Sequence, residues 1–454
     1  MAIRQLVGVT VAVLTTLSLV ACSGGPADGT GEEPAAVQST DFFGYLVDTP
    51  LLTTNAGSEV GSSSNTEALS GRLYPAVFVP GPSGQMIPNT DLVTTQVLPG
   101  ANRQVVYTLT ENARYSDGVP VTCTDFLLHY KAGVHAGLFG SHLPQTREVL
   151  RLDCEPGQKR FTVVFNENSG GRWRHLFGPG TVLPSHAVAA KAGLSEHELH
   201  TALATDDWVT LSEVAPVWRD GFDLDAFDPQ LQVTSGPFVI DRVGEQGEVV
   251  LVPNEHYYGD APNLRTIVVW PGGTDPRQLD EAGALRIADI RRGQQDFVDR
   301  DDPTNTLTIE ERVGDLTDTL VLANAGVLGS PWARQAFAAC VDQRAVAAES
   351  SRVSGIEVPP VGLHSLQHND PLAPLLADVA EGHLGTDLTR AQGLWGTTVR
   401  IGYAGPNERK AAMVEAIRAS CEPAGVTVVD ASAEAGTLAD LNRLGTGQWG
   451  EQIV

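Results

Sequence analysis

The chain has 454 residues and a formal net charge of −25 at pH 7, from 55 acidic and 30 basic side chains. This acidic excess argues against DNA, RNA and anionic lipid surfaces as partners, because all three are polyanions. At about 150 residues per domain, the length allows two or three domains, each large enough to bury a core.

The N-terminus resembles an export signal. Arg4 gives a short positive segment, and the uncharged apolar run over residues 6–21 is shorter than the roughly 20 residues that a membrane-spanning helix needs. The run ends in Leu19-Val20-Ala21-Cys22, which resembles the bacterial lipobox. We therefore expect residues 1–21 to be a cleaved signal peptide. Cys22 should carry a lipid that anchors the protein at the extracellular face of the cytoplasmic membrane.

Residues 22–37 are rich in Gly, Pro, Ala and Glu, which predicts a flexible tether between the lipid and the folded body. From residue 41 onward the pattern becomes mixed α/β. In the first half, runs rich in β-branched residues predict strands at 105–109, 160–165, 247–253 and 266–270. A helix is expected to run through residues 126–134, with Thr124 or Asp125 as its N-cap.

After about residue 300 the pattern is again mixed. We expect strands at 319–323, 398–403 and 425–429, and helices at 331–350 and 408–421. The order strand, helix, strand in the last three segments predicts a βαβ unit with parallel strands. Residues 351–372 are rich in Pro, Gly and His, which predicts a long loop.

Beyond Cys22 there are four cysteines, Cys123, Cys154, Cys340 and Cys421. An even number in an oxidising compartment favours two disulfides. Of the three possible pairings we expect Cys123–Cys154 and Cys340–Cys421, because each pair lies within one proposed half of the chain. No pair has the CxxC spacing of a redox motif or a structural zinc site.

Motifs for catalysis and metal binding are poor. The sequence contains no G-x-S-x-G, P-loop or dinucleotide-binding glycine pattern. His197 and His200 are three apart, whereas a zinc-protease helix needs histidines four apart, so we expect a solvated helix face. His364 and His368 have that spacing but fall in the Pro-rich loop. We expect a non-enzymatic protein without a metal or another cofactor.

Three blocks resemble the family 5 extracellular solute-binding proteins, the peptide- and nickel-type binding subunits of ABC importers. Residues 106–130 look like the family's strand, "SDG-x-P-V-T" turn and helix beginning "DF". Residues 233–264 are similar to its "GTGPF" strand and "N-x-x-Y-W-G-x-x-P" segment. The third block, residues 320–346 and 399–429, resembles its "R-x-A…D-R" helix and following strand, through Arg334, Ala336, Asp342 and Arg344.

The resemblance implies an α/β, two-lobed periplasmic-binding-protein-like fold of class II. Lobe I would span residues 38–300 with an inserted subdomain at about 73–214, and lobe II would span residues 301–454. The chain ends at Val454, about where the family would begin its last lobe II strand, so whether lobe II is complete stays open. The aspartate with which dipeptide binders hold a ligand's amino terminus would lie beyond this point, so peptide specificity also stays open.

The resemblance further implies a monomer that traps a small peptide or similar solute between its lobes and delivers it to ABC permease subunits. Asn55 and Ser58, in the loop at residues 53–58, would contact the ligand, together with Trp270 and Asn324. An asparagine offers both a donor and an acceptor to a peptide backbone, and a tryptophan offers a flat apolar wall.

A second function stays open. Residues 171–177 and 183–186 resemble a non-transport lipoprotein of the same fold, implicated in regulating lipomannan and lipoarabinomannan assembly in actinobacteria. The bias towards Ala, Gly, Asp and Arg, with few Lys, is typical of a high-GC actinobacterium.

Overall fold

The computed structural model describes residues 42–441, with gaps at 65, 82–84, 291–296, 300, 302, 304–306, 312, 315–316, 364–365, 367–369, 371, 433–435 and 439, together with residues 452–453. These residues belong to one compact unit that runs from Thr40 to the C-terminus. Cys22, the tether, His364 and His368 lie outside the described residues. Within the described ranges, no helix has the length and apolar character needed to cross a bilayer.

A five-stranded sheet has the order β11-β1-β10-β9-β8. Its strands are β1 (Phe43–Leu46), β8 (Phe238–Val243), β9 (Val249–Pro253), β10 (Ile267–Trp270) and β11 (Ile287–Ala288). β1 runs parallel to β10 and β11, whereas β8, β9 and β10 form antiparallel pairs. All four residues of β10 are buried, as their continuous apolar run predicts. The strands predicted at 247–253 and 266–270 are confirmed.

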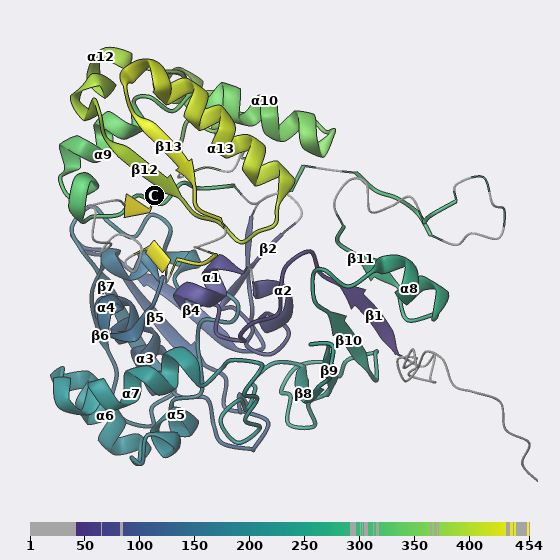
Figure 1. Cartoon of the computed structure of the whole chain (residues 1–454). Coiled ribbons are helices and arrows are strands. Elements are labelled where there is room, and N and C mark those ends of the chain that lie inside the picture. The colour runs from purple at the N-terminus through teal and green to yellow at the C-terminus, as the bar shows by residue number, and fades with distance from the viewer. Residues whose placement is uncertain are drawn as a thin grey trace, which may run out of the picture. The chain divides into compact units, whose positions relative to one another are not determined.

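A four-stranded antiparallel sheet has the order β4-β5-β7-β6, with β4 at Val93–Leu98, β5 at Gln104–Leu109, β6 at Val149–Asp153 and β7 at Arg160–Phe165. Four helices accompany it, α3 (Cys123–Val134), α5 (Ser185–Lys191), α6 (Glu196–Thr205) and α7 (Trp208–Asp220) (Figure 1). α3 packs on the sheet through Phe126, whose ring centroid lies 4.7 Å from that of Phe161 on β7. Both sheets contribute to one hydrophobic cluster, which we call the large core.

The first turn of α3 differs from the prediction. The N-cap is Thr122, whose side chain accepts a hydrogen bond from the backbone N–H of Thr124. The Asp125 carboxylate accepts from the backbone N–H of Thr122 at 2.8 Å and so completes a capping box. The expected cap at Thr124 or Asp125 was wrong because the helix already begins at Cys123.

A smaller core lies in the second half, built around the parallel sheet β13-β12-β14. Its strands are β12 (Thr398–Ile401), β13 (Thr427–Asp430) and β14 (Gln452–Ile453), and the helices α9 (Pro331–Ala338), α10 (Gln343–Ser354) and α13 (Glu408–Cys421) accompany them. In Figure 1, α13 and α10 lie side by side next to β12 and β13. The predicted βαβ unit is confirmed as β12, α13 and β13.

Two predicted elements of the second half were wrong. Residues 319–323 form no strand, because they pair with no neighbour among the described residues. The helix expected at 331–350 is two helices, α9 and α10. The chain breaks between them because the Asp342 side chain accepts hydrogen bonds from the backbone N–H groups of Arg344 and Ala345 and starts a new helix.

The histidine pair on α6 was also partly mispredicted. His197 is exposed as expected, but His200 is only 4% exposed. Its Nδ1 lies 3.1 Å from the hydroxyl of Thr124 on α3. His200 therefore joins two helices of the large core instead of facing solvent.

The remaining elements are short. They are α1 (Glu59–Ser63), α2 (Glu67–Ser70), β2 (Phe78–Pro80), β3 (Met86–Pro88), α4 (Ala136–Phe139), α8 (Pro276–Glu281), α11 (Ala377–Glu381) and α12 (Leu388–Ala391), with single 3₁₀ turns at Pro144–Glu148, Trp173–His175, Gly326–Leu328, Ala373–Leu376, Gln392–Leu394 and Glu422–Ala424.

Candidate ligand-binding site

The loop at residues 53–58 is buried, and hydrogen bonds of its side chains hold it in place. Every residue of this loop is buried. The Asn55 side chain donates from Nδ2 to the carbonyl of Trp218 at 2.8 Å and accepts the backbone N–H of Gly57 at 3.0 Å. The Ser58 hydroxyl donates to the Asn55 carbonyl and accepts from the backbone N–H of Gly61, which caps α1. Both side chains thus fix the path of the loop.

Asn55→Ala should lower the free energy of unfolding by about 2 kcal/mol, because the substitution leaves the buried carbonyl of Trp218 and the buried N–H of Gly57 without partners. Asn324→Ala is the matched control, since Asn324 is exposed and a surface change usually stays within about 0.5 kcal/mol. Urea unfolding of both variants measures the difference. Equal stabilities would contradict the structural role of Asn55.

Trp270 and Asn324 lie in different surroundings from the loop. Trp270 ends β10, is 5% exposed and packs with Leu46, Val250 and Leu279 in a cluster on the sheet. Its indole N–H has no hydrogen-bond partner among the described residues. Asn324 follows residues 319–323, which have no regular secondary structure, and is exposed. The structure therefore brings Asn55 and Ser58 together, and places Trp270 and Asn324 elsewhere; ligand contact by any of the four stays a prediction.

The structure pairs the cysteines in the expected way. Cys123 bonds to Cys154 and ties the first turn of α3 to the residue that follows β6. Cys340 bonds to Cys421 and ties the break between α9 and α10 to the end of α13. One disulfide therefore belongs to the large core and the other to the smaller core.

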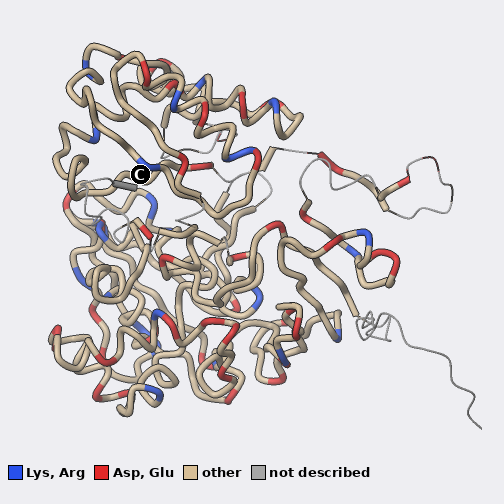
Figure 2. Tube along the Cα trace, in the orientation of Figure 1, with Lys and Arg blue, Asp and Glu red and all other residues tan. Residues whose placement is uncertain are grey.

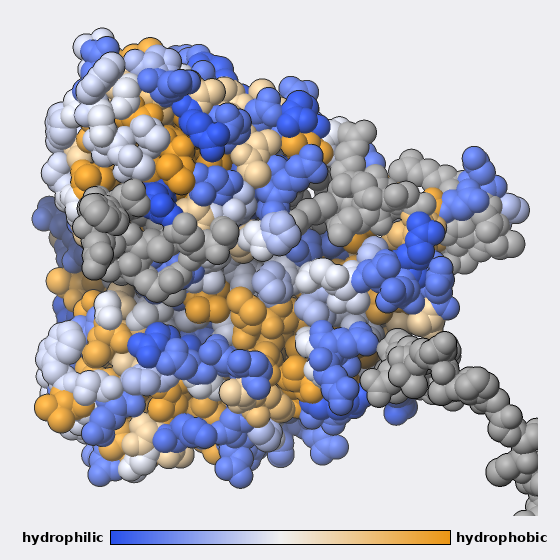
Figure 3. Space-filling view, in the orientation of Figure 1, coloured by the Kyte–Doolittle hydropathy of each residue, from blue (hydrophilic) through white to orange (hydrophobic). Residues whose placement is uncertain are grey.

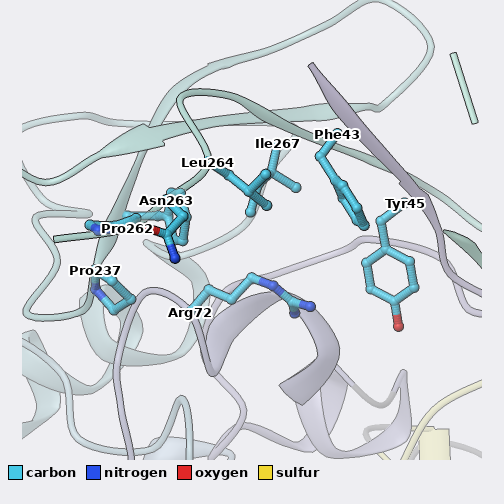
Figure 4. Close-up of a pocket in the computed structure, with 9 residues that line it drawn as sticks. Phe43, Tyr45, Arg72, Pro237, Pro262, Asn263, Leu264 and Ile267 are labelled. Atoms are coloured by element: carbon cyan, nitrogen blue, oxygen red, sulfur yellow. The ribbon is translucent and has the colours of Figure 1, made fainter. Parts of the chain in front are cut away.

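A pocket of about 420 Å³ lies beside the five-stranded sheet (Figure 4). Phe43 and Tyr45 of β1, Ile267 of β10 and Phe238 of β8 line it, together with Pro237, Pro262, Asn263, Leu264 and Arg72. Its volume is within the range of small-molecule sites, which are typically about 300–1,000 Å³ and mostly apolar with few polar groups. This cavity is a candidate site among the described residues, and its lining is the more apolar of two cavities.

The polar side of this pocket is formed by Arg72 and Tyr45. The guanidinium carbon of Arg72 lies 5.2 Å from the centroid of the Tyr45 ring, within the range of a cation–π contact. Arg72 also donates from Nη1 to the carbonyl of Ala68, and the Tyr45 hydroxyl donates to Asp289. Burial, reinforced by the hydrogen bond to Asp289, raises the pKa of Tyr45 far above its ordinary value, so the phenol stays neutral.

Charges of both signs are distributed over the described part of the chain. Acidic residues are spread along the described trace with basic residues among them (Figure 2). Hydrophilic and apolar residues are interspersed over the face seen in Figure 3. In the described part of the chain, no group of three or more His, Cys, Asp or Glu side chains is placed to hold a metal ion.

Sequence reasoning missed this pocket, although part of its wall carried a signal. Five lining residues lie within the second family-like block, at positions 233–264, namely Pro237, Phe238, Pro262, Asn263 and Leu264. The prediction used that block only to identify a fold. Arg72 and Tyr45 carried no recognisable motif, because they lie far apart in the sequence and meet only in the folded chain.

Comparison with known proteins gives a consistent result. The family model for bacterial extracellular solute-binding proteins, family 5, matches residues 91–442. An uncharacterised lipoprotein of Mycobacterium tuberculosis is 29% identical over 447 residues, which cover 94% of this chain and 74% of that protein.

Two solved structures share the fold. An oligopeptide-binding protein from Thermus thermophilus, complexed with a pentapeptide, is 15% identical with a TM-score of 0.56, covering 89% of this chain and 75% of that one. A periplasmic EDTA-binding protein is 18% identical with a TM-score of 0.53, covering 88% and 76%. One fold thus serves chemically different ligands.

Proposed function

Because the chain belongs to the bacterial extracellular solute-binding proteins of family 5, we propose that it captures a peptide or similar small solute between two lobes and delivers it to the permease of an ABC importer. The observation that carries this proposal is the family match along residues 91–442. A peptide is one candidate solute, since the fold is shared with a protein complexed with a pentapeptide and also with an EDTA-binding protein.

The mechanism requires binding energy and no chemical step. A solute that contacts both lobes binds the closed arrangement more tightly than the open one, so it shifts the population towards the closed form. A permease that recognises the closed form then receives only loaded protein. Cys22 would carry the lipid that keeps this protein at the membrane, in agreement with the name of the mycobacterial relative as a lipoprotein.

Full-length protein, extracted in detergent from membranes of its own host, should carry a peptide-sized adduct in native mass spectrometry. Added peptide should also raise its melting temperature, since ligand at about 100 times its Kd stabilises a fold by about 2.7 kcal/mol.

The substitutions Asn324→Ala and Trp270→Phe should reduce this rise in melting temperature. Phenylalanine is the better replacement for Trp270, because alanine in this buried cluster would cost about 3–5 kcal/mol and confuse folding with binding.

A chain that carries no adduct, and whose melting temperature does not respond to a random peptide library, would contradict solute capture. The non-transport role in envelope glycolipid assembly would then be the better hypothesis.

A further inference from the structure

The pocket beside the five-stranded sheet has one charge in an apolar wall. Among its nine lining residues only Arg72 is ionised at neutral pH, and six others are Phe, Leu, Ile or Pro side chains, namely Phe43, Pro237, Phe238, Pro262, Leu264 and Ile267. In Figure 4 the Arg72 side chain runs beneath Leu264 and Ile267 towards the Tyr45 ring. A ligand here would therefore meet hydrocarbon on most sides and a guanidinium on one.

Arg72 is held in place without being neutralised. One of its donors is used by the Ala68 carbonyl, and its cation stacks on Tyr45. Within the described ranges it forms no ion pair with a carboxylate. A guanidinium has five N–H donors in a planar fork that fits a carboxylate with two parallel hydrogen bonds. Donors therefore remain for an incoming anion.

Asp289, an acidic residue near Tyr45, forms no ion pair with Arg72 in the described part of the chain. Asp289 accepts the hydrogen bond of the Tyr45 hydroxyl. Since the phenol keeps its proton, Tyr45 adds no negative charge next to Arg72. Asn263, the remaining polar residue of the wall, offers a side-chain amide that can donate to an oxyanion or accept from a neutral group.

We propose that this pocket binds an apolar acid, with its hydrocarbon against Phe43, Leu264 and Ile267 and its carboxylate on Arg72. Burial of the hydrocarbon supplies most of the affinity, and the guanidinium selects the anionic head. The same chemistry is offered by a free medium-chain fatty acid and by the C-terminal residue of an apolar peptide. The proposal rests on the lining of this pocket and does not require solute capture between two lobes.

Calorimetry on the full chain tests the proposal with two matched probe pairs. Octanoate is compared with octan-1-ol, and N-acetyl-leucine with N-acetyl-leucinamide, so that each pair differs in the carboxylate. The parent should bind at least one acid and bind its neutral partner more weakly. Arg72→Gln should weaken acid binding about tenfold or more, because hydrogen bonds to charged groups are the stronger ones, and Arg72→Lys should restore part of the loss.

Arg265→Gln is the control, because it removes an equal charge from an exposed arginine next to the lining loop. Thermal unfolding of each variant shows whether the fold is kept. Binding of octanoate alone would assign a fatty acid, and binding of N-acetyl-leucine alone would assign a peptide terminus. The proposal is overturned if neither acid binds the parent, if Arg72→Gln binds as tightly as the parent, or if Arg265→Gln loses as much affinity.

Discussion

Replacing Cys340 and Cys421 together with alanine should destabilise the smaller core by about 4 kcal/mol. The disulfide closes a loop with a sequence separation of 81, and the chain-entropy model gives a larger stabilisation for longer loops. Both cysteines are fully buried in a core that is much smaller than the large one. Since whole domains are stable by only about 5–15 kcal/mol, this loss is a large share of what holds β12 and β13 in place.

Hydrogen exchange followed by mass spectrometry localises the effect. Peptides that contain β12 and β13 should lose protection in the Cys340→Ala/Cys421→Ala variant, while β5 and β7 keep theirs. The Cys123→Ala/Cys154→Ala variant is the matched control, with a shorter loop of separation 31 and an expected loss near α3 and β6. Undiminished protection of β12 and β13 in the first variant would be the contrary result, and non-reducing peptide mapping checks both pairings.

Acid should cost the fold about 3 kcal/mol through His129 alone between pH 7 and pH 4. Burial lowers the pKa of His129 from 6.5 to about 4, against the smaller opposing effect of its hydrogen bonds to the backbone of Thr181 and Leu176. Between these two values the unfolded chain binds a proton that the folded chain does not. The contribution of His129 to stability is therefore complete above pH 6.5 and is lost as the pH falls.

Asp125 changes the stability of the fold in the opposite direction over nearly the same pH range. Burial raises its pKa from 3.8 to about 6, although the hydrogen bonds from Ser185 and Thr122 lower it. The folded state then holds a proton that the unfolded state releases, so this contribution is lost as the pH rises from 3.8 to 6. The pH dependence of the parent alone therefore cannot isolate His129.

Comparison of the parent with His129→Asn separates the contribution of His129 to the pH dependence of stability from that of Asp125. An asparagine amide can still donate to the Thr181 carbonyl, which lies 3.0 Å from His129 Nδ1, but it does not titrate. Urea unfolding at pH 7 and pH 4 should show that the variant loses about 3 kcal/mol less than the parent. His197→Asn, on the exposed side of α6, should follow the parent at both values. Identical losses in the parent and His129→Asn would refute the assignment.

Local sequence patterns predicted those elements whose ends are marked by neighbouring residues in the sequence. β7 was placed at its true ends, because an apolar and β-branched run is followed by Asn and a turn. α13 was also placed at its true ends; Asn407 caps its start, and a 3₁₀ turn that ends at Gly425 follows its last residue. The break between α9 and α10 was missed because residues 339–342 contain neither Gly nor Pro and suit a helix. The Asp342 side-chain cap starts a new helix there.

The candidate site was harder to predict because one residue type can serve two purposes. Asn55 has the chemistry of a ligand contact, but the same donor and acceptor are used by Trp218 and Gly57. Arg72 has no motif around it, and its contact with Tyr45 forms only in the folded chain. Burial and partners of this kind are properties of the folded chain, so they are absent from a local pattern.

The Asp125 carboxylate ties together two parts of the chain that lie far apart in sequence. One oxygen accepts from Thr122, and the other accepts both the backbone N–H and the hydroxyl of Ser185, 60 residues further on. The "DF" at the end of the first family-like block therefore joins the starts of α3 and α5. A protein of this family can therefore change its ligand while it keeps this junction. The motif that identifies the family thus carries no information about the ligand.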